Sequence, residues 1–164
     1  MEIRSEAPGE TGAIAALITA AFIGVPQSDG TEARIVDRLR RQGGLRLSLV
    51  AVSEGGLSGH IAFSGVKIGG QAGAWYGLGP LSVAPDRQGQ GIGSALLRAG
   101  LDRLQGLNAA GVVVLGDPGF YGRFGFAVRA GLRYPNVPLE YFQALSFGAE
   151  IPEGVVSYHP AFSG

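Results

Sequence analysis

The sequence predicts an α/β (α+β) fold with a single mixed, mostly antiparallel central sheet flanked by helices. Helix-like patterns occupy the start of the chain, and three strand-like segments separated by short turns follow them, as in an antiparallel meander. The third strand then runs through a glycine-rich loop into a helix and a further strand, a crossover that makes two neighbouring strands parallel. The length of 164 residues suits one domain, residues 1–164.

The first elements are a short strand and two helices. Residues 1–4 can form the strand. Residues 10–22 are rich in alanine, isoleucine and leucine at helical spacing, which predicts a helix that ends at the glycine and proline of 24–27. A second helix is expected from a cap at Asp29 to about Arg41.

The meander starts with an alternating strand at residues 45–52, followed by a hairpin turn and a partner strand at 57–68. Three leucines of the first strand should point to one face: Leu45, Leu47 and Leu49. A third strand is expected at 72–83, interrupted by Gly77-Leu78-Gly79-Pro80. Because proline cannot donate to the ladder, we expect a bulge or a splayed end there.

The remaining elements follow the glycine-rich loop. A helix should run to about Gln105, with one apolar stripe formed by Leu97, Leu101 and Leu104. Residues 112–115 form a continuous apolar strand of the kind that is buried on both faces. A short helix is expected at 118–124, and short strands complete the chain, the last at 155–158.

The composition excludes several classes of function. Basic and acidic residues balance at 13 each, whereas a nucleic-acid-binding protein usually carries a basic excess, so we expect no nucleic acid partner. No apolar run reaches the roughly 20 residues that span a bilayer, and the N-terminus lacks the apolar segment of a signal peptide. We therefore expect a cytoplasmic location and no membrane partner. Without cysteine, and with two histidines far apart in sequence, no metal site is expected.

The glycine-rich loop at 88–94 predicts an anion site. Alternating glycines let successive backbone N–H groups point into one concavity, and the first N–H groups of the following helix add partial positive charge. This arrangement suits a phosphate or pyrophosphate. No glycine precedes a lysine, as a P-loop requires, and the dinucleotide fingerprint fails because neither Ser94 nor Leu96 is the glycine that it needs. The alternative is a plain turn that joins a strand to a helix.

The residues around the loop decide between these alternatives. Gln88-Gly89-Gln90-Gly91-Ile92-Gly93 resembles the pyrophosphate motif of the GNAT superfamily of N-acetyltransferases, and Leu81-Ser82-Val83-Ala84-Pro85 resembles the family's cofactor-binding strand. Residues 116–126 resemble its second signature, a tyrosine followed by Gly-Phe. The stretch from Gly77 to Phe126 is similar to a bacterial branch of predicted N-acetyltransferases. The resemblance implies the GNAT fold, in which splayed parallel strands form the acyl-CoA cleft.

The resemblance also implies acetyl-CoA (coenzyme A) as co-substrate and assigns its contacts. The pantetheine arm would pair with the backbone of Leu81, Ser82 and Val83. The pyrophosphate would bind at the loop, formed by Gln88, Gly89, Gln90, Gly91, Ile92, Gly93 and Ser94. The N–H of Leu81 is the expected donor to the oxyanion of the tetrahedral intermediate. Arg87 could help with the phosphates or be a solvated loop arginine.

Acetyl transfer to an amine needs a proton donor for the departing thiolate. By the same resemblance Tyr121, four residues before Gly125-Phe126, is the candidate donor; the alternative is a packing tyrosine in an aromatic cluster. The general base stays open between Asp117, Tyr76, His60 and water. Asp117 could instead cap a helix, Tyr76 could pack on the sheet, and His60 could be a satisfied sheet histidine.

The expected function is transfer of an acetyl group from acetyl-CoA to a primary amine of a small-molecule or peptide acceptor. The alternatives are another acyl donor or a hydroxyl acceptor, or a CoA-binding module without turnover. A homodimer is common in the superfamily. Three charged residues could touch the acceptor or form a solvated helix face: Glu32, Arg34 and Arg38. Four aromatic residues could border the acceptor site or pack in the core: Trp75, Tyr134, Tyr141 and Phe142.

Overall fold

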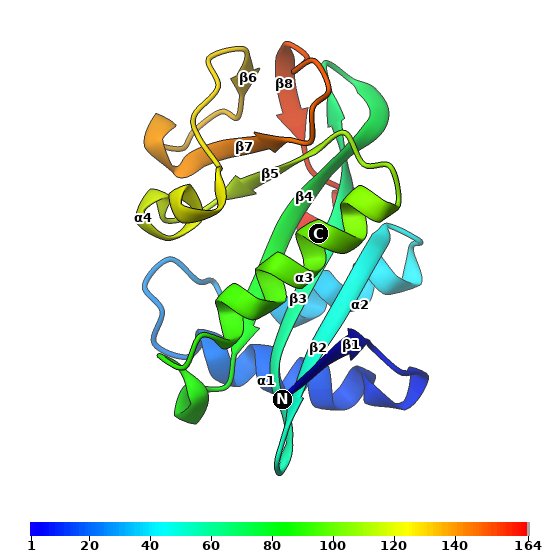
Figure 1. The fold of residues 1–164 in the computed structure, drawn as a ribbon, viewed down its shortest axis with the longest axis vertical. Helices are drawn as coiled ribbons and strands as arrows, with labels where there is room; N and C mark the ends of the chain where they lie inside the picture. The colour runs from blue at the N-terminus through cyan, green and yellow to red at the C-terminus, as the bar shows by residue number, and fades with distance from the viewer. Residues whose placement is uncertain (164) are drawn as a thin grey trace.

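The computed structural model describes residues 1–163 and contains an eight-stranded sheet with helices on both faces (Figure 1). The strands are β1 (Glu2–Ser5), β2 (Leu45–Ser53), β3 (Gly56–Ile68), β4 (Gln71–Val83), β5 (Gly111–Leu115), β6 (Leu132–Arg133), β7 (Phe142–Ser146) and β8 (Gly154–Ser157). The helices are α1 (Thr11–Phe22), α2 (Glu32–Arg41), α3 (Ile92–Gly106) and α4 (Pro118–Tyr121). These bounds lie close to those that the sequence predicts.

The sheet is mixed and mostly antiparallel, as predicted. Its order is β1-β2-β3-β4-β5-β7, with β8 paired to the end of β3 and to β6. The first four strands form an antiparallel meander, and β7 is antiparallel to β5. The crossover through α3 makes β4 and β5 parallel, as the strand–loop–helix–strand order requires.

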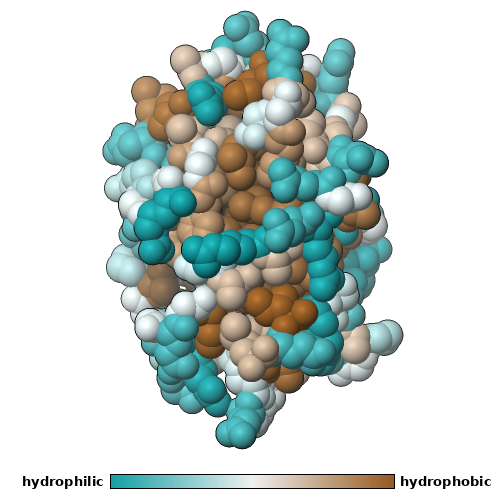
Figure 2. Space-filling view, viewed as in Figure 1, coloured by the Kyte–Doolittle hydropathy of each residue, from teal (hydrophilic) through white to brown (hydrophobic). Residues whose placement is uncertain are grey.

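The helices form one layer on each side of the sheet. Helix α3 lies across one face, whereas α1 and α2 lie on the other (Figure 1). The predicted stripe of Leu97, Leu101 and Leu104 packs with Phe63 of β3 in the core cluster on the α3 side. Seen from that side, apolar residues gather over the middle of the molecule (Figure 2). Within residues 1–163, no helix has the length and apolar composition to cross a membrane.

Two local predictions are wrong. Leu45 does not share a face with Leu47 and Leu49, because the register between β2 and β3 shifts between Leu45 and Leu47 and turns Leu45 toward α1 and α2. Asp29 does not cap α2, whose N-cap residue is Thr31. The Asp29 carboxylate instead accepts hydrogen bonds from the Thr31 N–H (3.1 Å) and hydroxyl, which stabilises the turn that precedes the helix.

The predicted interruption of the third strand is a bulge that opens the sheet. Gly79 and Pro80 of β4 together oppose the single residue Ala62 of β3. Pairing between β4 and β5 covers only Trp75–Leu78 on β4, although β4 continues to Val83. The two parallel strands therefore part at the bulge, and the gap faces their carboxyl ends.

The α3 layer depends on a close approach of the helix to β3. A Cβ added at Gly100 would lie 2.5 Å from the Phe63 ring, whereas one at Gly106 would meet nothing within 4 Å. We expect Gly100→Ala to lower the free energy of unfolding by about 1–3 kcal/mol through overpacking. Gly106→Ala should leave it unchanged or raise it by up to about 1 kcal/mol. Urea unfolding measures both; equal effects would contradict this packing.

Candidate functional site

The glycine-rich loop has the backbone conformation that an anion site needs. Gly89 (φ +79°) and Gly91 (φ +81°) both adopt the left-handed region that favours glycine, and Gly91 is the N-cap residue of α3. The whole loop from Gln88 to Gly91 is exposed. The first N–H groups of a helix lack partners within the helix, so those of α3 are available to a bound anion.

The strand before the loop offers a free backbone edge. Beyond the bulge, Leu81, Ser82 and Val83 pair on one side with β3. Among the described residues no strand pairs with their other side, because the β5 ladder ends at Leu78. The unpaired N–H and C=O groups on this edge can bind an extended polar chain as an added strand would.

Two side chains at the base of the loop are engaged with the protein itself. The Arg87 guanidinium donates to the carbonyl of Glu54 (2.8 Å), and the Gln88 amide donates to the carbonyl of Val83 (3.3 Å). Both bonds tie the loop to the strands around it. The structure therefore gives Arg87 a role in shaping the loop, which is neither of the two alternatives weighed from the sequence.

Tyr121 lies in α4, directly after the carboxyl end of β5. Its ring meets Phe120 edge-on at 4.9 Å and Phe126 at 5.7 Å between centroids. The ring also covers Gly116, where an added Cβ would lie 2.5 Å from it. Burial raises the pKa of Tyr121 to about 12, and the charge of Asp117 adds to this shift. The phenol keeps its proton at neutral pH, as an ordinary tyrosine does, and the raised pKa makes it a weaker acid. Tyr121 is not among the residues that line the cleft between the parted strands.

A cleft of about 910 Å³ opens at the point where β4 and β5 part. Its floor is the bulge Leu78-Gly79-Pro80 and the end of β5 at Leu115-Gly116-Asp117. Its walls come from the α1–α2 region and from the C-terminal third, formed by Phe22, Gln27, Glu32, Ile35, Tyr134, Val137, Pro138, Tyr141, Tyr158 and Phe162. The cleft thus lies beside the free edge of β4.

The predicted acceptor-side residues divide between the cleft and other places. Glu32, Tyr134 and Tyr141 line the cleft. Trp75 and Phe142 are buried in the core. The structure assigns the other two charged candidates elsewhere: Arg34 is exposed outside the cleft lining, and Arg38 donates to the carbonyl of Ala161 (3.2 Å).

Of the three side chains considered as general base, Asp117 is the one that lines the cleft. Its carboxylate also accepts a hydrogen bond from the Gly119 N–H (2.9 Å), so it caps α4 as well. Tyr76 packs against the core cluster on the α3 side, and His60 is fully buried away from the cleft.

His60 belongs to a polar network under α2. Its Nε2 lies 2.8 Å from the Ser48 hydroxyl oxygen. The Ser48 hydroxyl donates its hydrogen to the Glu6 carboxylate, and that carboxylate forms an ion pair with Arg40 at 2.8 Å. Burial lowers the pKa of His60 to about 4; the Arg40 charge acts in the same direction and the Glu6 charge against it. His60 is therefore neutral and lies away from the cleft. Its Nδ1 has no partner among the described residues, so it is not the fully satisfied sheet histidine considered from the sequence.

The cleft also contains aromatic residues that the sequence analysis did not select, above all Tyr158 and Phe162. Tyr158 follows β8, and its ring lies over Gly77 of β4, where an added Cβ would be 2.6 Å away. Tyr158 and Gly77 are far apart in sequence, and no local pattern around Tyr158 indicates this contact.

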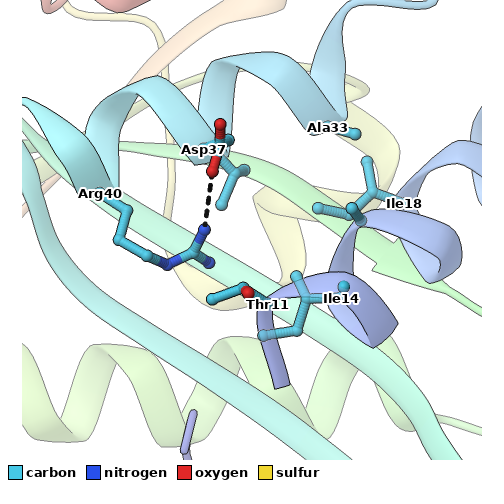
Figure 3. Close-up of a pocket in the computed structure, with 9 residues that line it drawn as sticks. Thr11, Ile14, Ile18, Ala33, Asp37 and Arg40 are labelled. Carbon is cyan, nitrogen blue, oxygen red and sulfur yellow. Dashed lines mark ion pairs between the residues drawn. The ribbon is translucent and has the colours of Figure 1, made fainter. Parts of the chain in front are cut away.

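A second cavity, of about 210 Å³, lies between α1 and α2 (Figure 3). Figure 3 shows Asp37 and Arg40, joined by an ion pair of 3.7 Å, at its polar end and Ile14 and Ile18 on its apolar side. It contains none of the residues predicted for cofactor binding or catalysis. Within residues 1–163, no group of three or more histidine, aspartate or glutamate side chains is placed to hold a metal ion.

Similarity to known proteins gives the class to which this arrangement of splayed strands, glycine-rich loop and cleft belongs. Residues 45–128 match the model of the acetyltransferase (GNAT) domain, and this range includes the bulge, the loop and Tyr121. The chain therefore belongs to the GNAT acetyltransferase family, and it is an acyltransferase. The predicted family and enzyme class are confirmed.

Individual relatives match over almost the whole chain. The chain is 39% identical to the Escherichia coli (strain K12) protein named "Uncharacterized N-acetyltransferase YhbS", over 99% of each chain. The crystal structure of E. coli YhbS in complex with CoA has a TM-score of 0.88 and 37% identity, covering 99% of this chain and 92% of that one. The crystal structure of a GNAT family acetyltransferase from Brucella melitensis in complex with acetyl-CoA has a TM-score of 0.88 and 50% identity. The match covers 98% of this chain and 97% of that one.

The buried histidine predicts a pH-dependent stability. An unperturbed histidine has a pKa of 6.5, and folding lowers that of His60 to about 4. Below pH 6.5 the unfolded chain therefore binds a proton that the folded chain does not, and stability is lost as the pH falls. Between pH 7.5 and 5 we expect the free energy of unfolding to fall by about 2 kcal/mol from this residue. Urea unfolding at several pH values measures this.

His60→Gln is the control, because its amide can keep a hydrogen bond to Ser48 but does not titrate in this range. The variant should show a flatter pH profile over the same window. If its stability falls with pH as steeply as that of the wild type, His60 is not the titrating group.

Proposed function

We propose that the chain transfers an acetyl group from acetyl-CoA to a primary amine of a small-molecule or peptide acceptor, with residues 1–164 acting as one domain. The observation that carries this proposal is that the free edge of β4 and the cleft lie at the same bulge. The free edge of β4 begins there, and the 910 Å³ cleft opens there. The complexes of the Brucella melitensis relative with acetyl-CoA and of YhbS with CoA support the choice of cofactor. A homodimer and a cytoplasmic location stay predictions from the sequence.

The cofactor would lie along the strand and the loop that the sequence singles out. The pantetheine arm would pair with the free edge of Leu81, Ser82 and Val83, which brings the thioester to the bulge. The pyrophosphate would accept hydrogen bonds from backbone N–H groups between Gly89 and Ser94, where the positive end of α3 favours negative charge. This arrangement needs glycines at positions 89 and 91, because both have positive φ.

The chemistry would take place where the two strands part. The neutral amine attacks the thioester carbonyl carbon, and the oxyanion that forms accepts a hydrogen bond from the N–H of Leu81. The carbon–sulfur bond then breaks, and Tyr121 donates its proton to the departing thiolate. The proton that the amine gives up passes to water or to Asp117, which lines the cleft, and water returns a proton to the Tyr121 phenolate.

Binding of the pyrophosphate can be tested at the N-cap residue of α3. Gly91→Glu and Gly91→Gln introduce the same backbone strain at a positive φ, but only glutamate adds a negative charge beside the phosphates. In calorimetric titration with acetyl-CoA, we expect Gly91→Glu to bind at least about tenfold more weakly than Gly91→Gln. NADH and ATP serve as controls that should not bind. Failure of the folded wild type to bind acetyl-CoA would overturn the cofactor assignment.

The role of Tyr121 can be tested without disturbing its packing. Tyr121→Phe keeps the ring against Gly116 but removes the proton donor. We expect kcat to fall by about 100-fold or more, whereas the Kd for acetyl-CoA stays the same. Because the pKa of Tyr121 is raised to about 12, wild-type kcat should not decline up to pH 9 through loss of this proton. Free-thiol release measures the rate, and a kcat within threefold of wild type would make Tyr121 a packing residue.

A further inference from the structure

The walls of the 910 Å³ cleft are aromatic. Tyr158 meets Tyr134 edge-on at 5.4 Å and Phe162 at 5.1 Å between ring centroids, and all three line the cleft. At the carboxyl end of β5, Leu115 is 43% exposed, as is Tyr141, which lies beside it because the Gly116 N–H donates to the Tyr141 carbonyl. Side chains of this kind favour a ligand with an apolar body, and aromatic faces also attract an ammonium group.

The charges on the cleft have one sign. Among the described residues that line it, Glu32 and Asp117 are acidic and none is basic. Both Glu32 carboxylate oxygens accept from the Ser28 hydroxyl at 2.8 Å, which holds this side chain in place. A cationic amine is therefore attracted, whereas an acceptor that carries a carboxylate or phosphate meets like charge.

The hydroxyl of Tyr158 is a polar group without a partner. It is buried, and no described residue hydrogen-bonds to it. An unpaired buried hydroxyl destabilises the free protein, and phenylalanine would fill the same space over Gly77 without this cost. Burial raises the pKa of Tyr158 above its usual range, with smaller contributions from Tyr134 and Tyr121, so the phenol keeps its proton.

Gly77, under the Tyr158 ring, immediately precedes Leu78, the last residue of β4 that pairs with β5 before the two strands part. The hydroxyl is closed off from solvent in the free protein, so an acceptor in the cleft supplies the missing hydrogen bond only when a neighbouring side chain shifts to admit it. A neutral amine suits the position, because its N–H can donate to the phenolic oxygen while its lone pair stays free to attack the thioester.

We propose that this cleft binds a primary amine carried on an apolar, preferably aromatic, body. The amino end meets the Tyr158 hydroxyl and the Leu78–Pro80 bulge, and the body lies between Tyr134 and Tyr141. The proposal rests on the proposed acetyl transfer and adds the class of acceptor. Tyr158 orients the acceptor and takes no part in proton transfer.

The test compares four acceptors at saturating acetyl-CoA by free-thiol release. 2-Phenylethylamine carries a primary ammonium group on an aromatic ring. Phenylalanine has the same ring and an added carboxylate, whereas ethanolamine and spermidine have an amine but no aromatic ring. We expect kcat/KM for 2-phenylethylamine to exceed each of the others by about 100-fold. Equal or better turnover of ethanolamine or spermidine would overturn the inference and leave the acetyltransferase assignment standing.

Two variants test the assigned contacts. Asp117→Asn keeps the cap on α4, since asparagine caps as well as aspartate. Because it removes a negative charge that repels the carboxylate of phenylalanine, the ratio of kcat/KM for 2-phenylethylamine to kcat/KM for phenylalanine should fall about tenfold. Loss of a general base would instead lower both rates together. Asp102→Asn, an exposed carboxylate on α3 outside the cleft lining, is the matched control and should change neither rate.

Tyr158→Phe should lower kcat/KM for 2-phenylethylamine by about tenfold or more, with an unchanged Kd for acetyl-CoA and an unfolding midpoint equal to or above that of wild type. A lower midpoint with unchanged kcat/KM would make the hydroxyl structural and overturn its role. If acetyl-CoA binds but none of the four amines is acetylated, the acceptor class is wrong. If acetyl-CoA does not bind, the proposed function itself fails.

Discussion

Pro80 has no amide hydrogen, so the ladder of β4 has to break where this residue stands. The break takes the form of a bulge of Gly79 and Pro80 against Ala62. Pairing with β5 ends just before it, at Leu78, and beyond it β4 keeps only its partner β3. Three features depend on this divergence. It leaves the edge of Leu81–Val83 unpaired, it opens the cleft, and it sets the place where a bound thioester and an acceptor could meet.

Two glycines beside the divergence let tyrosine rings come close to the strands. Gly77 on β4 lies under Tyr158, and Gly116 after β5 lies under Tyr121. A side chain at either glycine would overlap the ring, since the added Cβ would approach within 2.6 Å and 2.5 Å respectively. One tyrosine comes from the helix after β5 and the other from the end of the chain. Burial raises the pKa of both phenols above the ordinary value of a tyrosine, so both stay protonated even in alkaline solution.

The polar network under α2 shows how chemistry-bearing residues can be structural. His60, Ser48, Glu6 and Arg40 resemble a catalytic set in their residue types, yet they join α2 to β2 and β3 and lie outside the cleft lining. Burial acts to raise the pKa of Glu6, but hydrogen bonds from Arg40 and Ser48 outweigh it and lower that pKa. The network therefore holds one ion pair and one neutral imidazole, which fixes the start of the chain against α2 and β2.

The sequence by itself determined the order and kind of the elements, the interruption of β4, and the loop of Gln88–Ser94. These features are local: helical spacing, alternation, and glycines at positions of positive φ act over a few residues. The tertiary structure alone decided the face of Leu45, because a bulge arises between two strands. It alone placed Tyr158 over Gly77 and separated Asp117, at the cleft, from His60, in the core. Contacts between segments far apart in the chain depend on how the sheet closes, and no local pattern carries that information.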